Sequence, residues 1–180
     1  MQDLTDNELV EHFRSGDQSA RAKVFEEVHS RLGRGLLQLC RRMFANSADA
    51  EDAFQETALA LYRALPSFRG EARLTTWAYR IAMRTCLHGK RKQRSDFSES
   101  LQESLPAKQD ESRREKELAL RFDRAVAALR PTYRAVFSLC CIDELSQVDV
   151  AQILGIPEGT VWTRLHRARK ELAASLEDVL

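Results

Sequence analysis

Small polar, basic and apolar side chains alternate between residues 158 and 172 in a pattern that suits contact with nucleic acid. Gly159 and Thr163 are small enough to let a helix approach a groove closely, and Arg167 can hydrogen-bond to base edges or phosphates. At 100° per residue an apolar stripe falls on the other side and comprises Val161, Leu165, Ala168 and Leu172. The residues expected at DNA are Gly159, Thr160, Trp162, Thr163, Arg164, His166, Arg167 and Lys170.

The residues just before this helix predict a second, shorter helix and a tight turn. Ser146 and Asp149 have the spacing of a capping box, and they are followed by one apolar face formed by Val150, Ala151 and Leu154. Gly155 suits the turn, and Pro157 suits the first turn of the next helix. Two short helices in this order predict a helix-turn-helix DNA reader. The alternative is a solvated basic helix that belongs to a bundle.

Charge is segregated along the chain, although its formal net charge is only +1. Residues 47–62 hold four acidic residues and no basic one, namely Asp49, Glu51, Asp52 and Glu56. Residues 66–94 hold eight basic residues against Glu71 alone, a balance of +7. Blocks of opposite sign on successive helices suggest two partners, a basic protein surface for the first and a polyanion for the second.

The composition predicts a mostly helical protein of one or two small domains. The chain has 180 residues, with 13 aromatic residues (Phe 8, Tyr 3, Trp 2) and 11 glycines and prolines (Gly 7, Pro 4). No apolar run is long enough to predict a membrane span. The acidic, amphipathic start, with a capping box at Thr5 and Glu8, is unlike a signal peptide and predicts a cytoplasmic protein.

Four cysteines, Cys40, Cys86, Cys140 and Cys141, lie in apolar helical contexts without a C-x-x-C pair. We interpret them as small buried side chains rather than metal ligands. The sequence holds no glycine-rich phosphate loop, metal-ligand cluster or nucleophile–base pair, so we expect no cofactor, no metal and no enzymatic activity.

Three units follow from the periodicity. Residues 1–94 predict helices at 4–14, 20–45, 49–65 and 75–92, with a loop at 66–74. Residues 95–113 are rich in Ser, Gln and acidic residues, which is typical of a flexible linker. Residues 114–180 predict helices at 114–129 and 133–141, separated by a break at Pro131, and then the helix-turn-helix. We therefore expect an all-α protein with two small helical domains.

Three segments together resemble regions 2 and 4 of bacterial sigma factors of the extracytoplasmic-function (ECF) group. They are DAEDAFQETALALYRAL (49–65), FRGEARLTTWAYRIA (68–82) and LSQVDVAQILGIPEGTVWTRLHRARKEL (145–172). The third segment alone would fit other helix-turn-helix regulators, but the first two upstream of it are much more specific. The resemblance covers nearly the whole chain apart from the linker.

The resemblance implies that the acidic helix docks on the clamp coiled-coil of core RNA polymerase. The matching residues are Asp49, Asp52, Gln55, Glu56 and Leu59, with Leu61 as an apolar neighbour. A purely structural alternative is that the acids favour the start of a helix. The resemblance also implies a polymerase flap contact, and an anti-sigma partner that covers the polymerase-binding faces and could hold the protein at the membrane.

The following loop and helix would read the −10 promoter element as a single strand, and the helix-turn-helix would read the −35 element. A flipped base needs a polar pocket, nearby planar groups and cations for the phosphates. The candidates are Phe68, Arg69, Arg73, Thr75, Thr76, Trp77, Arg80 and Arg84. Because Trp77 also lies on the apolar stripe of its helix, both burial and base stacking stay open for it.

Three positions depart from the family pattern. Arg84 and His88 stand where Asn and Asp are usual, and Trp162 stands where Arg or Lys is common. Two other classes of protein remain open from the sequence. One is a stand-alone helix-turn-helix regulator whose N-terminal helices form a dimerisation module, and the other is an enzyme, for which the sequence offers little.

Overall fold

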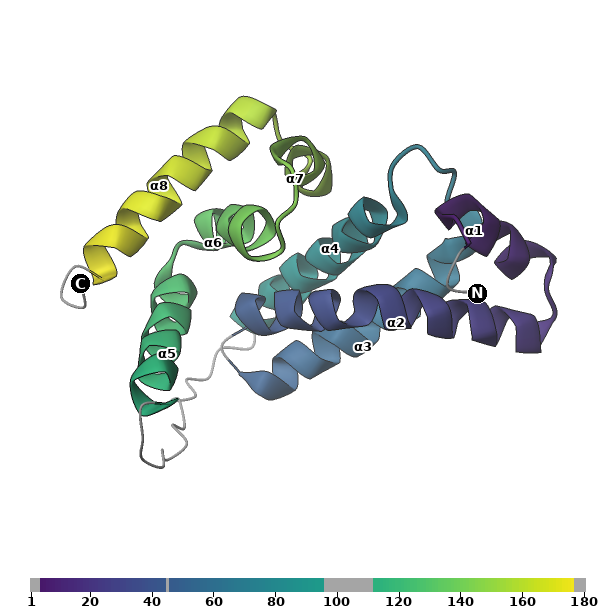
Figure 1. The fold of residues 1–180 in the computed structure, drawn as a ribbon, viewed down its shortest axis with the longest axis horizontal. Coiled ribbons are helices and arrows are strands. Elements are labelled where there is room, and N and C mark those ends of the chain that lie inside the picture. The colour runs from purple at the N-terminus through teal and green to yellow at the C-terminus, as the bar shows by residue number, and fades with distance from the viewer. Residues whose placement is uncertain (1–3, 45, 96–111, 177–180) are drawn as a thin grey trace.

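In a computed structural model, residues 4–44, 46–95 and 112–176 are described, and every regular element within these ranges is helical (Figure 1). The N-terminal half comprises α1 (Asp6–Ser15), α2 (Gln18–Met43), α3 (Ser47–Ala64), the 3-10 turn η1 (Leu65–Ser67) and α4 (Leu74–Ser95). The C-terminal half comprises α5 (Ser112–Ala128), α6 (Pro131–Phe137), the π-helical turn η2 (Ser138–Ile142), α7 (Gln147–Leu154) and α8 (Glu158–Leu176). The all-α expectation is confirmed, and most of the expected linker lies outside the described residues.

The N-terminal half begins with the expected capping box. The Thr5 side chain accepts from the backbone N–H of Glu8, and the Glu8 carboxylate accepts from the backbone N–H of Thr5 at 2.8 Å. The inner faces of α1 and α2 meet η1 and the start of α4 in one apolar cluster. Its buried members are Leu9, Val10, Phe13, Val24, Val28, Leu65, Phe68 and Leu74. This packing holds the loop between α3 and α4 against α1.

The C-terminal half contains the expected helix-turn-helix. Ser146 caps α7 by accepting from the backbone N–H of Asp149 at 3.1 Å, and Gly155 ends it with a φ of 63° that favours glycine. The expected stripe of Val161, Leu165, Ala168 and Leu172 is the buried face of α8. Pro131 begins α6 instead of only separating two helices, because its missing N–H has no partner to lose at that position.

The two halves pack directly against each other. Figure 1 shows α7 close to the first turns of α4, and residues of these two helices are in contact. One continuous apolar cluster includes buried residues of both halves, among them Leu39 and Met83 in the first half and Leu139 and Val150 in the second. Among the described residues, no helix combines the length and apolar character needed to cross a membrane.

Candidate polymerase and nucleic-acid interfaces

One face of α3 carries the expected acidic residues. Asn46 caps the helix by accepting from the backbone N–H of Ala48 at 2.8 Å. Asp52, Gln55 and Glu56 are exposed, and Asp49 is half-buried. Since the acids continue to Glu56, well beyond the first turn, stabilisation of the helix start cannot account for all of them.

Of the two leucines on α3 that were expected at the polymerase interface, one is exposed and the other is buried. Leu59 is 57 % exposed beside the acidic residues, so it can contact a partner. Leu61 is 4 % exposed and belongs to the core, so its proposed role as an apolar neighbour at the interface is wrong. An α-helix turns 200° in two residues, which places these two leucines on opposite faces.

The loop between η1 and α4 is positioned by side chains of α1, which sequence reasoning did not single out. The Arg14 guanidinium donates to the backbone oxygens of Pro66 at 2.9 Å and Phe68 at 2.6 Å. Asp6 accepts from the backbone N–H of Leu74 at 2.8 Å, so α1 supplies a cap for the start of α4. These contacts join residues more than 50 positions apart, and no local pattern indicates them.

Phe68 was expected to contact DNA, and the structure contradicts this expectation. It is 3 % exposed and packs edge-on against Trp77, with ring centroids 5.4 Å apart. Trp77 is partly buried against the same apolar cluster, so its aromatic face contributes to packing. The buried Phe68 side chain therefore anchors the loop between η1 and α4 to the apolar cluster, while Arg69 beside it is exposed.

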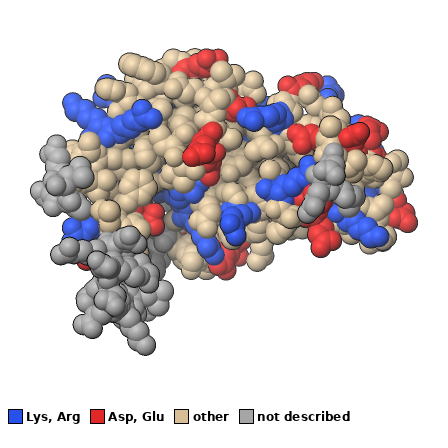
Figure 2. All heavy atoms as spheres, viewed as in Figure 1, with Lys and Arg blue, Asp and Glu red and all other residues tan. Residues whose placement is uncertain are grey.

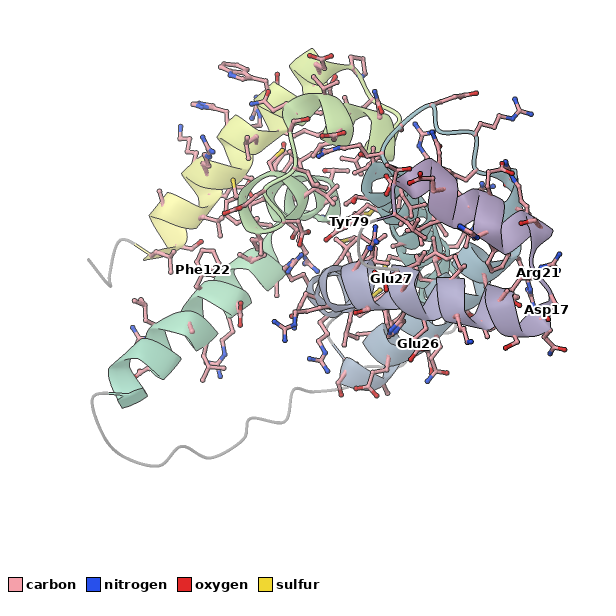
Figure 3. The ribbon with its side chains drawn as sticks, turned by 45° about the vertical axis from the view of Figure 1, so that its right-hand side comes forward. Asp17, Arg21, Glu26, Glu27, Tyr79 and Phe122 are labelled. Carbon is pink, nitrogen blue, oxygen red and sulfur yellow. The ribbon has the colours of Figure 1, made fainter. Side chains whose placement is uncertain are left out.

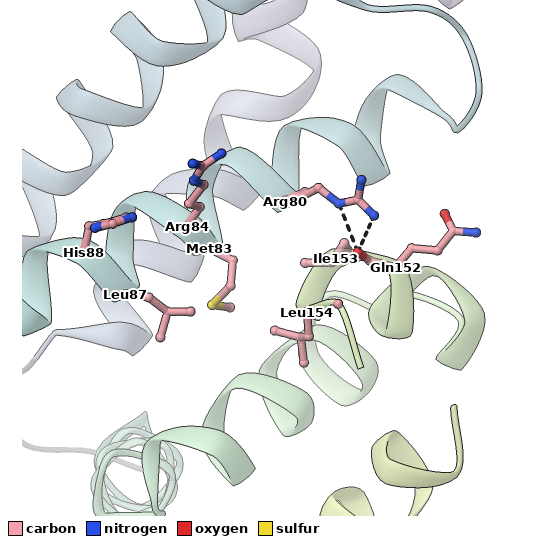
Figure 4. Close-up of a pocket in the computed structure, with 9 residues that line it drawn as sticks. Arg80, Met83, Arg84, Leu87, His88, Gln152, Ile153 and Leu154 are labelled. Carbon is pink, nitrogen blue, oxygen red and sulfur yellow. Dashed lines mark hydrogen bonds between the residues drawn. The ribbon is translucent and has the colours of Figure 1, made fainter. Parts of the chain in front are cut away.

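Three further −10 candidates on or just before α4 are engaged by α7. Arg73 donates to the carboxylate of Asp149 at 2.7 Å, and the Thr76 hydroxyl donates to the same carboxylate at 2.8 Å. Arg80 donates through two nitrogens to the backbone oxygen of Gln152, at 3.0 and 2.6 Å (Figure 4). We call these bonds the α4–α7 contact. Thr75 is half-buried, and Thr76 is 2 % exposed.

Asp149 therefore has a second role besides its place in the expected capping box. Ser146 donates to its carboxylate at 2.6 Å, and the remaining partners of that carboxylate come from the N-terminal half. Burial raises the pKa of Asp149, but the hydrogen bonds from Ser146 and Thr76 and the charge of Arg73 outweigh burial and lower that pKa overall. Asp149 is thus held as a carboxylate that accepts from the Arg73 guanidinium and from the hydroxyl groups of Thr76 and Ser146.

A second, buried polar cluster joins the two halves. Arg42, in the last turn of α2, donates to both carboxylate oxygens of Asp143 at 2.6 Å. The Tyr79 hydroxyl also donates to Asp143, and Figure 3 shows Tyr79 at the junction between the halves. The Asp143 side chain is 6 % exposed and that of Arg42 is 14 % exposed. Nothing in the sequence pattern connects these residues, because Arg42 and Asp143 are 101 positions apart.

The Tyr79 hydroxyl should lose its proton only at high pH. Burial, assisted by the negative charge of Asp143, raises the pKa of Tyr79 to about 12. Because the folded-state pKa is raised, the associated stability is fully present below pH 10 and is lost as the pH rises through about 12. We expect the difference in tyrosinate absorbance between wild type and Tyr79→Phe, recorded by stopped-flow pH jump before unfolding, to have its midpoint near 12. A midpoint near 10 would show that the hydroxyl is solvated.

A groove lies beside the α4–α7 contact. It has a volume of about 340 Å³, with Met83 and Leu87 on α4 and Leu154 on α7 among its lining residues (Figure 4). Arg84 and His88, two of the departures from the family pattern, also line it and are exposed. Arg84 therefore remains accessible to phosphate, as expected for a −10 candidate.

The outer face of α8 is accessible over its whole length. Of the −35 candidates, Thr160 and Arg164 are half-buried, and the exposed ones are Gly159, Trp162, Thr163, His166, Arg167 and Lys170. Figure 2 shows basic side chains on the surface over α8, among mainly uncharged atoms. Trp162 is 61 % exposed and stacks on His166, with centroids 5.7 Å apart and an interplanar angle of 7°. The stack holds both rings on the outer face of the helix.

A groove of about 590 Å³ runs between the starts of α6 and α8. Thr163, Arg164 and Arg167 line it from α8, and Thr132 and Tyr133 line it from α6. Sequence reasoning missed the two α6 residues, because they lie about 30 positions before the reading helix. Their hydroxyl groups add hydrogen-bonding capacity beside the basic residues.

The cysteines behave largely as expected. Cys40 and Cys86 are buried with their sulfur atoms 3.7 Å apart, and Cys140 and Cys141 are half-buried. Burial raises the pKa of Cys140 to about 11, which keeps it a thiol at neutral pH. Among the residues that the structure describes, no group of three or more His, Cys, Asp or Glu side chains could hold a metal ion.

Two helical domains, a helix-turn-helix and separate acidic and basic surfaces define a DNA-binding transcription factor with a protein partner. The family Sigma-70 region 2 matches residues 28–96, and the family Sigma-70, region 4 matches residues 119–172. The ECF RNA polymerase sigma factor SigW of Bacillus subtilis is 32 % identical over 94 % of this chain and 96 % of its own length. The ECF RNA polymerase sigma-E factor of Escherichia coli is 32 % identical over 98 % of this chain and 97 % of its own.

The chain therefore belongs to the ECF RNA polymerase sigma factors. Two solved structures share its fold. CnrH, in complex with the cytosolic domain of CnrY, is 27 % identical with a TM-score of 0.71, covering 97 % of this chain and 99 % of CnrH. The sigma factor RpoE of Bartonella quintana, in complex with the anti-sigma factor NepR, shares the fold at 24 % identity and a TM-score of 0.70, over 88 % of this chain and 99 % of its own.

Proposed function

We propose that this sigma factor binds polymerase and promoter DNA through three separate surfaces. The acidic face of α3, with Asp49, Asp52, Gln55, Glu56 and Leu59, binds the clamp coiled-coil of core RNA polymerase, and the C-terminal half also contacts the flap. The start of α4 and the loop before it read the −10 element through Arg69, Arg73, Thr76, Arg80 and Arg84. The outer face of α8 reads the −35 element. The domains correspond to residues 1–94 and 114–180, joined by a linker at 95–113.

The observation that carries this assignment is the opposite charge of the accessible faces. Asp52 and Glu56 are exposed on α3, while Arg80 and Arg84 are exposed on the next helix and Arg167 on α8. An acidic face cannot bind DNA favourably, because phosphates repel it, whereas basic faces attract DNA without regard to sequence. A protein partner for α3 and a nucleic-acid partner for α4 and α8 follow from that difference.

Three further aspects complete the proposal. The protein acts in the cytoplasm, where polymerase and promoter are found, and it catalyses no reaction itself, because RNA synthesis belongs to the polymerase. An anti-sigma factor holds it inactive by covering the polymerase-binding faces. The structure of RpoE with the anti-sigma factor NepR supports a partner of this kind, and CnrH also binds a protein, the cytosolic domain of CnrY.

The proposal is tested by reconstitution. Purified chain added to bacterial core polymerase should confer start-site selection in run-off transcription from a promoter library, with little initiation in its absence. A stand-alone helix-turn-helix regulator would instead bind specific duplex tightly without polymerase and select no start site. Absence of start-site selection at every promoter, with no inhibitor present, would contradict the proposed function.

A further inference from the structure

The two halves of the chain meet on one of the three proposed binding surfaces and leave the other two accessible. The acidic residues Asp52 and Glu56 on α3 are exposed, and so are Thr163 and Arg167 on α8. By contrast, α7 lies on the first turns of α4, where Thr76 is 2 % exposed. The α4–α7 contact thus engages Arg73, Thr76 and Arg80 of the proposed −10 surface and buries Thr76, while Arg69 and Arg84 stay exposed.

The groups that α7 offers to α4 resemble the oxygens of a nucleic-acid backbone. Arg73 and Thr76 donate to the two carboxylate oxygens of Asp149, and Arg80 donates to the Gln152 backbone oxygen. Guanidinium and hydroxyl donors bind phosphate oxygens with the same geometry as carboxylate oxygens. A DNA strand and α7 therefore compete for these donors.

The buried Arg42–Asp143 pair fixes this arrangement independently of the α4–α7 contact. Arg42 donates to both oxygens of Asp143, and Tyr79 donates to the same carboxylate. When the halves separate, both charges return to water together, so the desolvation cost of the pair is recovered and opening is not prohibited. Removing only one partner leaves the other charge buried and unpaired in the packed form, which disfavours packing.

We propose that α7 is a built-in competitor of single-stranded DNA. In the free chain the Arg42–Asp143 pair holds Asp149 and the Gln152 carbonyl against Arg73, Thr76 and Arg80, so α7 occupies hydrogen-bond donors of these three residues and masks this part of the −10 surface. The inference rests on the proposed −10 role of these three residues. The packed chain still offers α3 to polymerase and α8 to duplex DNA, so docking on polymerase precedes exposure of the −10 surface.

The masking lowers the apparent affinity for single strands by the fraction of chains that are open. We expect Asp143→Ala and Asp149→Ala to bind a fluorescein-labelled pool of random 12-nucleotide single strands at least about fivefold more tightly than the wild-type free chain. The radius of gyration from small-angle X-ray scattering should rise in Asp143→Ala. Asp123→Ala, which removes an exposed carboxylate from α5, is the matched control and should change neither quantity.

Circular dichroism checks that each variant is folded, and Asp149→Ala serves if Asp143→Ala does not fold. Unchanged single-strand binding in the folded variants would overturn the inference, whether or not the chain expands. An equal gain in Asp123→Ala would also overturn it, because the gain would then reflect net charge alone.

Failure of the underlying −10 assignment is a separate result. Arg80→Ala in the holoenzyme should reduce initiation at promoters that depend on the −10 element, whereas Asp149→Ala should initiate as wild type does. If Arg80→Ala has no effect on initiation, the proposed −10 role fails. If Arg80→Ala reduces initiation and the open variants gain no single-strand binding, only the masking inference fails.

Discussion

Reversing two charges on α3, in the double variant Asp52→Lys and Glu56→Lys, is expected to abolish stable binding to core polymerase. Both side chains are exposed and lie one turn apart on the same helix face. Against a basic partner, each substitution replaces an attraction with a repulsion, and like charges brought together at an interface cost several kcal/mol. We expect a loss of roughly 100-fold or more in affinity, since about 1.4 kcal/mol corresponds to a factor of ten.

The measurement is a titration of labelled holoenzyme assembly, paired with run-off transcription. Glu26→Lys, which changes an exposed glutamate on α2 in the same way, is the matched control and should bind polymerase as wild type does. Because both substituted side chains, Asp52 and Glu56, are exposed, the variant should keep its circular dichroism spectrum. Undiminished assembly by the double variant would show that another face binds the polymerase.

The second large effect is expected at Arg167 on α8. This side chain is exposed and lines the groove between the starts of α6 and α8. If its guanidinium reaches a base edge, Arg167→Ala should weaken recognition of the −35 element by about 1–3 kcal/mol and relax preference at one base pair. Initiation by the holoenzyme from promoters that vary only in the −35 element measures both quantities.

Arg169→Ala is the control on the same helix, because Arg169 is exposed but its guanidinium contacts the sulfur of Cys141 at 3.6 Å. Both variants lose one positive charge, so their difference isolates the contact in the groove from general attraction. A uniform loss over all −35 sequences in Arg167→Ala would make this residue a phosphate contact. The slope of the logarithm of the binding constant against the logarithm of the salt concentration would then be smaller in magnitude by about one. Equal losses in the two variants would contradict a specific role for Arg167.

Much of the fold could be predicted from local patterns. The helices of both halves, the capping box at Thr5 and the helix-turn-helix with Gly155 at its turn are consequences of short-range chemistry. The buried stripe of α8 follows from the helical period, since side chains three and four positions apart share a face. The separation of acidic and basic segments is likewise visible in the order of residues.

Predictions were wrong at positions where the residue type is common both at interfaces and in the core. Phe68 and Leu61 were expected at interfaces, yet both are buried. An aromatic ring or a leucine is compatible with either environment, and the packing of several helices decides which one it has. For Phe68 the deciding partners include Trp77 and the Arg14 side chain that holds its backbone oxygen.

The sequence by itself determined the helices, their apolar faces, the family and the sign of charge on each surface, because these depend on neighbours within a few turns. Only the tertiary structure decided that Asp149 faces Arg73 and Thr76, and that Arg42 pairs with Asp143 beneath Tyr79. Those partners are 73 to 101 positions apart in the sequence. From its sequence neighbours alone, each charged residue would be predicted to be an ordinary solvated side chain. Their pairing depends on how the apolar surfaces of the two halves meet, which no periodicity within either half encodes.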